Sequence, residues 1–153
     1  MLLQESKYLY MENINKENEK LKGGQGLEYL LVYTIGGLLY AYIELAWRGW
    51  THWSMVLCGG LCFLMMYICA DLPLSLPKKW LLSTAAVTAA EFYTGCLVNL
   101  RLQWNIWDYS SERWNLLGQI CPKFILLWFF ISIPGTALCL RLRPLLSQLS
   151  NFR

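Results

Sequence analysis

The chain has 153 residues, of which 56% are hydrophobic and only 15% are charged, whereas charged residues make up about 25% of an ordinary soluble domain. Four apolar blocks alternate with short polar joints, and each block has the roughly 20 residues that an α-helix needs to cross about 30 Å of hydrocarbon. The composition excludes a soluble enzyme core. The formal net charge of +3 comes from basic residues gathered at particular joints rather than along one face, so no nucleic-acid partner is expected.

The polar N-terminal segment, residues 1–26, is expected to be a cytoplasmic leader or a short surface helix. It contains no apolar stretch followed by a small-residue cleavage site, so the first apolar block should stay as an uncleaved anchor. Residues 141–153 should form a basic cytoplasmic tail. Between them the sequence predicts an all-α, polytopic transmembrane domain over residues 27–140, with helices at 27–48, 52–70, 80–100 and about 117–140.

The basic residues predict the orientation of these helices. Nine lie in the termini and the second joint, three lie in the first and third joints, and Lys123 lies inside the fourth helix. Because cytoplasmic loops are enriched in lysine and arginine, both termini should be cytoplasmic in a multi-pass protein of the cell membrane. The nine are Lys7, Lys16, Lys20, Lys22, Lys78, Lys79, Arg141, Arg143 and Arg153, and the three are Arg48, Arg101 and Arg113.

Tryptophans gather at the expected outer rim, which holds six of the eight. An aromatic belt at the level of the lipid headgroups explains them, and a role in lining a ligand site is the alternative. The six cysteines lie in apolar segments without a CxxC pair, so we expect small buried side chains rather than disulfides. With His52 as the single histidine, neither a metal site nor a cofactor is expected. The six tryptophans are Trp47, Trp50, Trp53, Trp104, Trp107 and Trp114.

Glu91 is the most informative residue, because it falls near the middle of the third apolar block. An ionisable group there costs about 2.5–3.5 kcal/mol or more on insertion scales. Thr88, Gly95 and Asn99 share its helical face. We therefore expect Glu91 to face the bundle interior, with Lys123, Arg48 or a hydroxyl as its partner.

Other polar residues cluster in the half of the bundle nearest the first and third joints, here named the outer half. Glu44 precedes Arg48 by one helical turn, so the two can neutralise each other. Lys123 follows Gln119 by four residues in the predicted fourth helix, and it either reaches outward to the headgroups or turns inward as a counter-ion. In the third joint, Asp108 is followed by serines, a pattern typical of a turn or helix cap.

These charges balance in number, since three acidic and three basic residues share the outer half. Balance fits a buried salt-bridge network, and it equally fits a site for a zwitterionic or dipolar ligand. The first and third helices each carry a glutamate and then a glycine near their outer ends, so two parallel helical hairpins with a site at their interface are a further hypothesis. The charged residues are Glu44, Glu91, Asp108, Arg48, Arg101 and Lys123.

The segments GGLLYAYIELAWRGWTHWSMVLCGG, EFYTGCLVN, WDYS and NLLGQIC carry a resemblance. With its ExxTG and WDYS motifs, the chain resembles the CmpB-type permease family of ABC-transporter type IV membrane proteins over roughly residues 30–130. The resemblance implies a multi-pass membrane protein with a permease-like role. The motif positions falling in this chain are Glu44, Arg48, Gly49, His52, Glu91, Thr94, Gly95, Asn99, Trp107, Asp108, Tyr109, Ser110, Asn115 and Gln119.

The resulting hypothesis is a permease-like protein that binds or translocates a small or amphiphilic solute through a polar site in the outer half. Two alternatives remain. One is an intramembrane enzyme acting on a lipid-linked substrate, with Glu91 or Asp108 as acid or base and Arg48 on a phosphate, and the other is a structural subunit of a membrane complex. The expected ligand-binding residues are Glu44, Arg48, His52, Glu91, Thr94, Asn99, Trp107, Asp108, Tyr109, Asn115, Gln119 and Lys123.

The expected partners follow from this hypothesis. Membrane lipids surround the bundle, and a second copy of the chain would thicken a bundle that is thin for a transporter. A separate ATPase or another membrane subunit is the third candidate. The chain itself has no GxxxxGK[ST] motif for a nucleotide, which weighs against the permease role. The second joint lies between the predicted second and third helices and has only about ten residues. It leaves little surface for docking an ATPase.

Overall fold

The computed structural model describes residues 2–151, and within them the side chains of residues 23–146 and Gln148. It confirms an all-helical protein with four helices long and apolar enough to cross a membrane. The helices are α1 (Leu2–Arg48), α2 (Trp53–Asp71), α3 (Leu76–Gly95), which a π-helical segment η1 (Cys96–Arg101) continues, and α4 (Pro122–Asn151).

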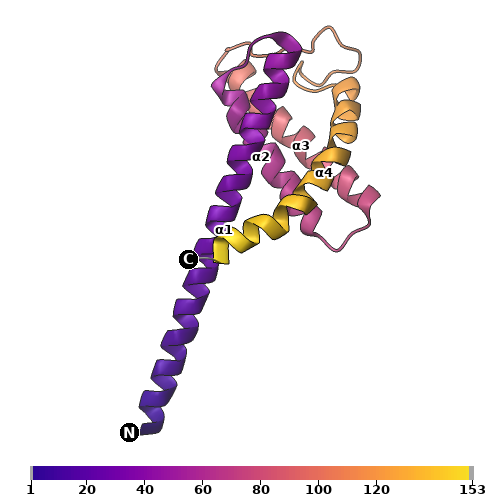
Figure 1. Cartoon of the computed structure of the whole chain (residues 1–153). Coiled ribbons are helices and arrows are strands. Elements are labelled where there is room, and N and C mark those ends of the chain that lie inside the picture. The colour runs from indigo at the N-terminus through magenta and orange to yellow at the C-terminus, as the bar shows by residue number, and fades with distance from the viewer. Residues whose placement is uncertain (1, 152–153) are drawn as a thin grey trace.

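Helix α1 is much longer than predicted. It begins at Leu2 rather than at residue 27, so the polar N-terminal segment and the first membrane span form one continuous helix. At 1.5 Å per residue its 47 residues extend for about 70 Å, and Figure 1 shows the N-terminal part projecting well beyond the other helices. The candidate membrane span within it is Gly23–Arg48.

The prolines account for two further corrections. Helix α3 begins at Leu76, four residues before the prediction, because Pro77 fits the first helical turn, where its missing N–H costs nothing. Helix α4 begins at Pro122 rather than at 117, and it continues through Pro134 and Pro144. The predicted tail from residue 141 is therefore helical as far as Asn151, whereas residues 152 and 153 lie outside the described residues.

Helix α2 lies at the centre of the bundle and contacts the three other helices. Within the most apolar window of each span, 61% of the residues are buried in α2 but only 22% in α1 and 17% in α4. Tyr67 and Cys62 of α2 pack with Val32 of α1, Val87 of α3 and Cys139 of α4 in the main core. Helices α1 and α4 thus present most of their span surface to the lipid.

Two pairs of glycines let α1 and α2 pack closely. A Cβ atom added to Gly36 would lie 2.3 Å from the Cβ of Phe63, and one added to Gly59 would lie 2.2 Å from the Cβ of Tyr40. Neither position has room for a side chain, so the two backbones approach as small residues permit in membrane helices. This contact fixes the position of Tyr40, which lines the cavity described below.

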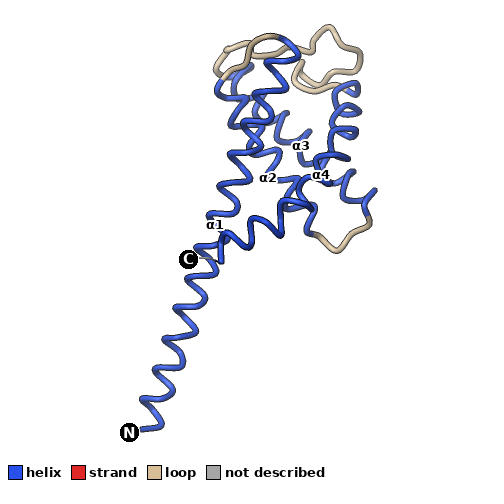
Figure 2. Tube along the Cα trace, in the orientation of Figure 1, coloured by secondary structure: helices blue, strands red, loops and turns tan. Residues whose placement is uncertain are grey.

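The loops divide the molecule into two ends (Figure 2). One, here named the loop end, carries the α1–α2 loop and the long segment between η1 and α4. The other, the termini end, carries the four-residue loop Leu72–Ser75. There Arg143 forms an ion pair with Asp71 at 2.8 Å, and the Lys79 Nζ donates to the carbonyl of Ala70 at 2.6 Å.

The orientation of these ends in the membrane stays a prediction, with the termini end in the cytoplasm. A membrane-impermeant maleimide should label a cysteine placed at Ser111, in the long loop, from outside intact cells. A cysteine placed at Ser75 should be labelled only after the cells are permeabilised. All native cysteines but Cys96 are buried. The wild-type protein, treated in the same way, is the control for labelling of these native cysteines. The opposite labelling pattern would reverse the orientation.

Candidate functional site

A cavity of about 280 Å³ lies between α1 and α4 towards the loop end. Its size is close to the lower end of the range for small-molecule pockets, about 300–1,000 Å³. Most of its wall is aromatic or aliphatic, and three charged side chains lie in it. The lining residues are Glu44, Arg48 and Glu91 together with Tyr40, Ile43, Trp47, Trp107, Tyr109, Phe124, Leu127, Trp128 and Ile131.

Glu91 of α3 is buried, as predicted, with 4% of its surface exposed. Its Oε2 accepts a hydrogen bond of 2.6 Å from the indole Nε1 of Trp128, and Tyr109 also lies within side-chain hydrogen-bonding reach. None of the ion pairs found among the described side chains includes Glu91. The carboxylate is therefore held by neutral donors rather than by a cation.

Lys123 is not the inward counter-ion that one prediction allowed. It lies in the first turn of α4, exposed, where its Nζ pairs with Glu112 Oε1 at 2.7 Å. Because α4 begins only at Pro122, this lysine is at the helix end and reaches the loop instead of the interior. The inward alternative is therefore wrong, and contact of Lys123 with the lipid headgroups stays a prediction.

Tyr109 reaches the cavity from the long loop. Its ring stacks on Phe124 with a centroid distance of 4.2 Å. Burial raises the pKa of Tyr109 well above its usual value, and the negative charge of Glu91 raises it further. The phenol is therefore protonated at physiological pH and is a hydrogen-bond donor available to Glu91.

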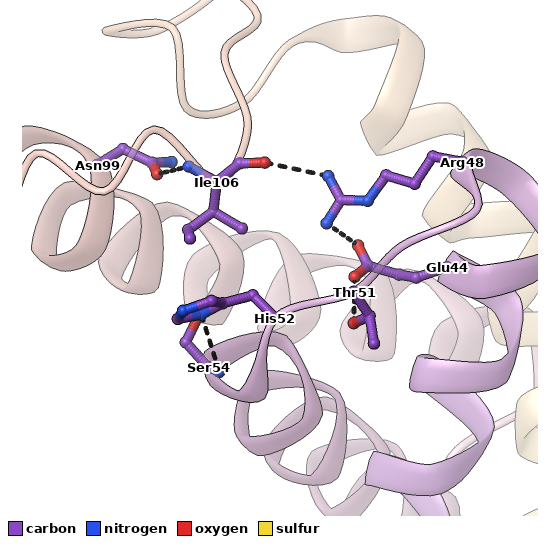
Figure 3. Close-up of polar contacts among 7 residues, drawn as sticks. All are labelled: Glu44, Arg48, Thr51, His52, Ser54, Asn99 and Ile106. Carbon is purple, nitrogen blue, oxygen red and sulfur yellow. Dashed lines mark hydrogen bonds and ion pairs between the residues drawn. The ribbon is translucent and has the colours of Figure 1, made fainter.

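Glu44 and Arg48, in the last turns of α1, line the cavity, and Figure 3 draws their polar contacts. The Arg48 Nη2 pairs with Glu44 Oε1 at 2.7 Å, as the one-turn spacing predicted, and Thr51 donates to Glu44 Oε2 at 2.7 Å. The Arg48 Nη1 donates to the carbonyl of Ile106 at 3.0 Å, and its guanidinium lies over the ring of Trp50. These contacts fasten the α1–α2 turn to the long loop.

Asn99, on η1, anchors the long loop from the other side. Its Oδ1 accepts from the backbone N–H of Ile106 at 2.7 Å, and its Nδ2 donates to Gln119 Oε1 at 2.8 Å (the first contact is drawn in Figure 3). The indole Nε1 of Trp107 donates to the carbonyl of Gln119 at 3.1 Å. Gln119 thus belongs to the loop, not to the predicted fourth helix.

Asp108 forms the turn that its sequence predicts. It is exposed, and its Oδ1 accepts hydrogen bonds from the backbone N–H and the hydroxyl of Ser110, which hold the pKa of the Asp108 carboxyl below its usual value. Asn115 bonds to the carbonyls of Ser110 and Glu112 and accepts from the N–H of Gly118. Both side chains stabilise the loop and lie outside the cavity lining.

The remaining predicted site residues also have structural contacts. His52 is the N-cap of α2, where its Nδ1 accepts from the backbone N–H of Ser54 at 3.3 Å, and its ring lies against Trp53 and Trp104. Thr94 is half-buried and reaches the thiol of Cys58 rather than the cavity. Neither residue lines the site.

Five of the twelve predicted residues therefore meet in the cavity, and the balanced network of six charges does not form as one unit. Glu44 and Arg48 pair with each other, Lys123 pairs with Glu112, and Glu91 and Asp108 have uncharged donors. The five that line the cavity are Glu44, Arg48, Glu91, Trp107 and Tyr109.

Seven lining residues were not among the predicted ligand-binding residues, and Trp128 is the one that bonds to Glu91. A signal existed: it is a tryptophan well inside the apolar fourth block, away from the tryptophan-rich outer joints. An indole N–H in hydrocarbon needs an acceptor, and a lone carboxylate at similar depth is the natural one. Its ring also packs against Tyr40 with a centroid distance of 6.0 Å.

A second cavity of about 210 Å³ adjoins the first between α1, α2 and α4. The two share Tyr40, Ile43, Trp128 and Ile131, and the charged residues of the first are absent from the lining of the second. Ile43 is 51% exposed and Leu127 44% exposed, and both belong to membrane spans. The two are together named the combined cavity, and its lining includes side chains exposed on the membrane spans of α1 and α4.

The hydrogen bonds of Asn99 predict a measurable effect on stability. Replacing Asn99 by alanine leaves the N–H of Ile106 and the amide of Gln119 without a buried partner, which should lower the free energy of unfolding by about 2–4 kcal/mol. Asn105→Gly is the control, since Asn105 is exposed, makes one long bond of 3.4 Å and has a φ of 50°, which glycine adopts without strain. Thermal unfolding of both variants in the same detergent measures the difference, and equal midpoints would refute the anchoring role.

The sequence also identifies the family. The family described as Putative ABC-transporter type IV matches residues 26–152, which span nearly all of the four candidate membrane helices. No curated protein and no solved structure gives a significant match. The family and the four apolar helices make this a multi-pass membrane protein related to transport. The chain belongs to the Putative ABC-transporter type IV family.

Proposed function

We propose that the protein binds an amphiphilic solute in the combined cavity and moves it within the cell membrane as a permease. The observation that carries the proposal is the buried carboxylate of Glu91, which lines an aromatic cavity that shares four lining residues with an apolar one. A solute with a polar head and an apolar body matches this division. The head would lie beside Glu91 and Tyr109, and the body would fill the space beside Ile131.

The energetic argument rests on the cost of a carboxylate in a membrane span, about 2.5–3.5 kcal/mol or more. The hydrogen bond from Trp128 offsets this cost only in part, and no basic side chain among the described residues pairs with Glu91. A well-packed apolar residue would stabilise the bundle at least as well. Binding of a ligand to the carboxylate of Glu91 would explain why an ionisable residue occupies this position.

The enzyme alternative gains no comparable support. Asp108, one candidate acid or base, is exposed and bonded to Ser110 outside the cavity. Arg48, the candidate phosphate ligand, is already engaged by Glu44 and by the carbonyl of Ile106. A phosphate at the cavity would also approach the carboxylate of Glu91, which none of the ion pairs among the described residues includes.

Family membership suggests association with other subunits of ABC transporters. The α2–α3 loop, Leu72–Ser75, is even shorter than predicted and offers little docking surface. The part of α1 that projects from the bundle offers more (Figure 1), and we propose that a separate ATPase or another membrane subunit docks there. A second copy of the chain is the alternative occupant.

Photo-crosslinking tests the solute site. An alkyl amphiphile with a diazirine in its tail should label residues of α1 and α4 that line the cavity, and mass spectrometry of the digested protein locates the label. Ile131→Trp, which fills the junction of the two cavities, should reduce that labelling at least about tenfold, equivalent to 1.4 kcal/mol of binding. Leu126→Trp is the matched control, because Leu126 is 57% exposed and lines neither cavity. Equal labelling of both variants would contradict the proposal.

A further inference from the structure

We infer that the solute is an organic cation, a hydrophobic amine or quaternary ammonium compound, whose charged head is bound by Glu91 inside a ring of aromatic side chains. The inference rests on the proposed function, because it names the chemical class that the same cavity selects. Three observations carry it: the charge of the lining, the nature of the walls and the donors already on the carboxylate.

The charge of the lining is unequal. Glu44 and Arg48 form an ion pair with each other, which leaves Glu91 as the one charged residue of the lining without an opposite charge. Lys123 is the basic residue of α4 that is closest in sequence to the lining residues of that helix. It is exposed and pairs with Glu112 outside the lining. A single positive charge brought in by the ligand would neutralise the cavity.

The aromatic side chains that line the cavity favour a cationic head group over other head groups of the same size. Aromatic faces attract ammonium groups, and the attraction grows when water is excluded. An anion would meet the unpaired carboxylate of Glu91, while Arg48 is already paired with Glu44. A neutral head would leave Glu91 without an opposite charge in a site of low dielectric. The aromatic side chains of the lining are Tyr40, Trp47, Trp107, Tyr109, Phe124 and Trp128.

The carboxylate has room for this ligand. Trp128 donates to Oε2 of Glu91, and Tyr109 is the second donor within reach. An ionised carboxylate accepts about four hydrogen bonds, so two acceptor positions stay open for an ammonium head. Ile43 and Leu127, the exposed aliphatic residues of the lining, give the apolar body of the ligand a path from the lipid.

Equilibrium dialysis tests the inference with four radiolabelled probes that share one alkyl chain and differ in the head: trimethylammonium, phosphocholine, sulfate and maltoside. The protein is held in nanodiscs of uncharged lipid, and binding to empty nanodiscs is subtracted. The wild type should bind the trimethylammonium probe at least about tenfold more tightly than the other three. Glu91→Gln should remove this preference while binding of the maltoside probe is unchanged.

Two variants make the result specific. Glu112→Gln is the matched control, since it removes a carboxylate at the loop end but outside the cavity, and it should bind all four probes as the wild type does. If Glu91→Gln does not fold, Trp47→Leu replaces it, because Trp47 lines the cavity with 82% of its surface exposed. This variant should weaken only the trimethylammonium probe, about twofold or more.

The outcomes separate the two proposals. Equal binding of all four probes, or tightest binding of phosphocholine or sulfate, overturns the cation inference and leaves the amphiphile site standing. Binding of no probe above empty nanodiscs overturns both. A trimethylammonium preference that survives Glu91→Gln also overturns the inference, because the charge would then be recognised elsewhere.

Discussion

Replacing Trp128 by phenylalanine is expected to lower the free energy of unfolding by about 2–3 kcal/mol, because the buried carboxylate of Glu91 loses a charge-assisted hydrogen bond. The double variant Trp128→Phe with Glu91→Leu should recover most of that loss, since both polar groups are then removed together. Solute binding should stay lost in the double variant. The pair of results would separate the functional role of Glu91 from any role in stability.

Thermal unfolding in one detergent, followed by circular dichroism, measures these differences. Trp80→Phe is the control for the loss of an indole, since Trp80 is half-buried near the start of α3 and does not line the cavity. A double variant as unstable as Trp128→Phe alone would show that the hydrogen bond to Glu91 is not the source of the loss.

Replacing Gly59 by leucine is expected to disrupt the packing of α1 on α2, with a loss of about 3 kcal/mol or more, at the upper end of the range for overpacked cores. The Cβ atom alone would lie 2.2 Å from the Cβ of Tyr40, so the helices must separate. The displaced Tyr40 would also deform the cavity. Tryptophan fluorescence and thermal unfolding together report both effects.

Gly26→Leu is the matched control for Gly59→Leu. A Cβ at Gly26 would meet nothing within 4 Å, and leucine is a better helix former than glycine by nearly 1 kcal/mol. The control should therefore be as stable as the wild type or slightly more stable. Equal losses in the two variants would mean that close contact at Gly59 is not what limits the side chain.

The four spans were predictable because the requirement is simple: a helix must be long and apolar enough to cross the hydrocarbon. The residues at which the helices begin and end were less predictable. Nothing in the polarity of the N-terminal segment distinguishes a separate surface helix from an extension of α1. The long loop is harder still, since Trp114 and Leu117 adopt positive φ angles of 58° and 54°, a conformation that large side chains rarely favour.

The site was predictable in part, since five of its lining residues, Glu91 among them, were expected from the sequence. Depth alone indicates that Glu91 turns inward, but its partner depends on which faces of α3 and α4 meet. Neighbouring residues on a helix differ by about 100° in direction, so Lys123 and Trp128, five residues apart on α4, point about 140° away from each other. Because Trp128 takes the inner position beside Glu91, Lys123 reaches the loop instead.

The central claim is that the protein moves an unmodified amphiphile by way of Glu91. The most direct test is purified protein in liposomes loaded with membrane extracts, followed by mass analysis of donor and acceptor compartments. Our account predicts that an unmodified compound, cationic and amphiphilic, redistributes with the wild type and not with Glu91→Gln. A new covalent product without redistribution would contradict it in favour of an enzyme, and a fixed membrane partner recovered without either would contradict it in favour of a structural subunit.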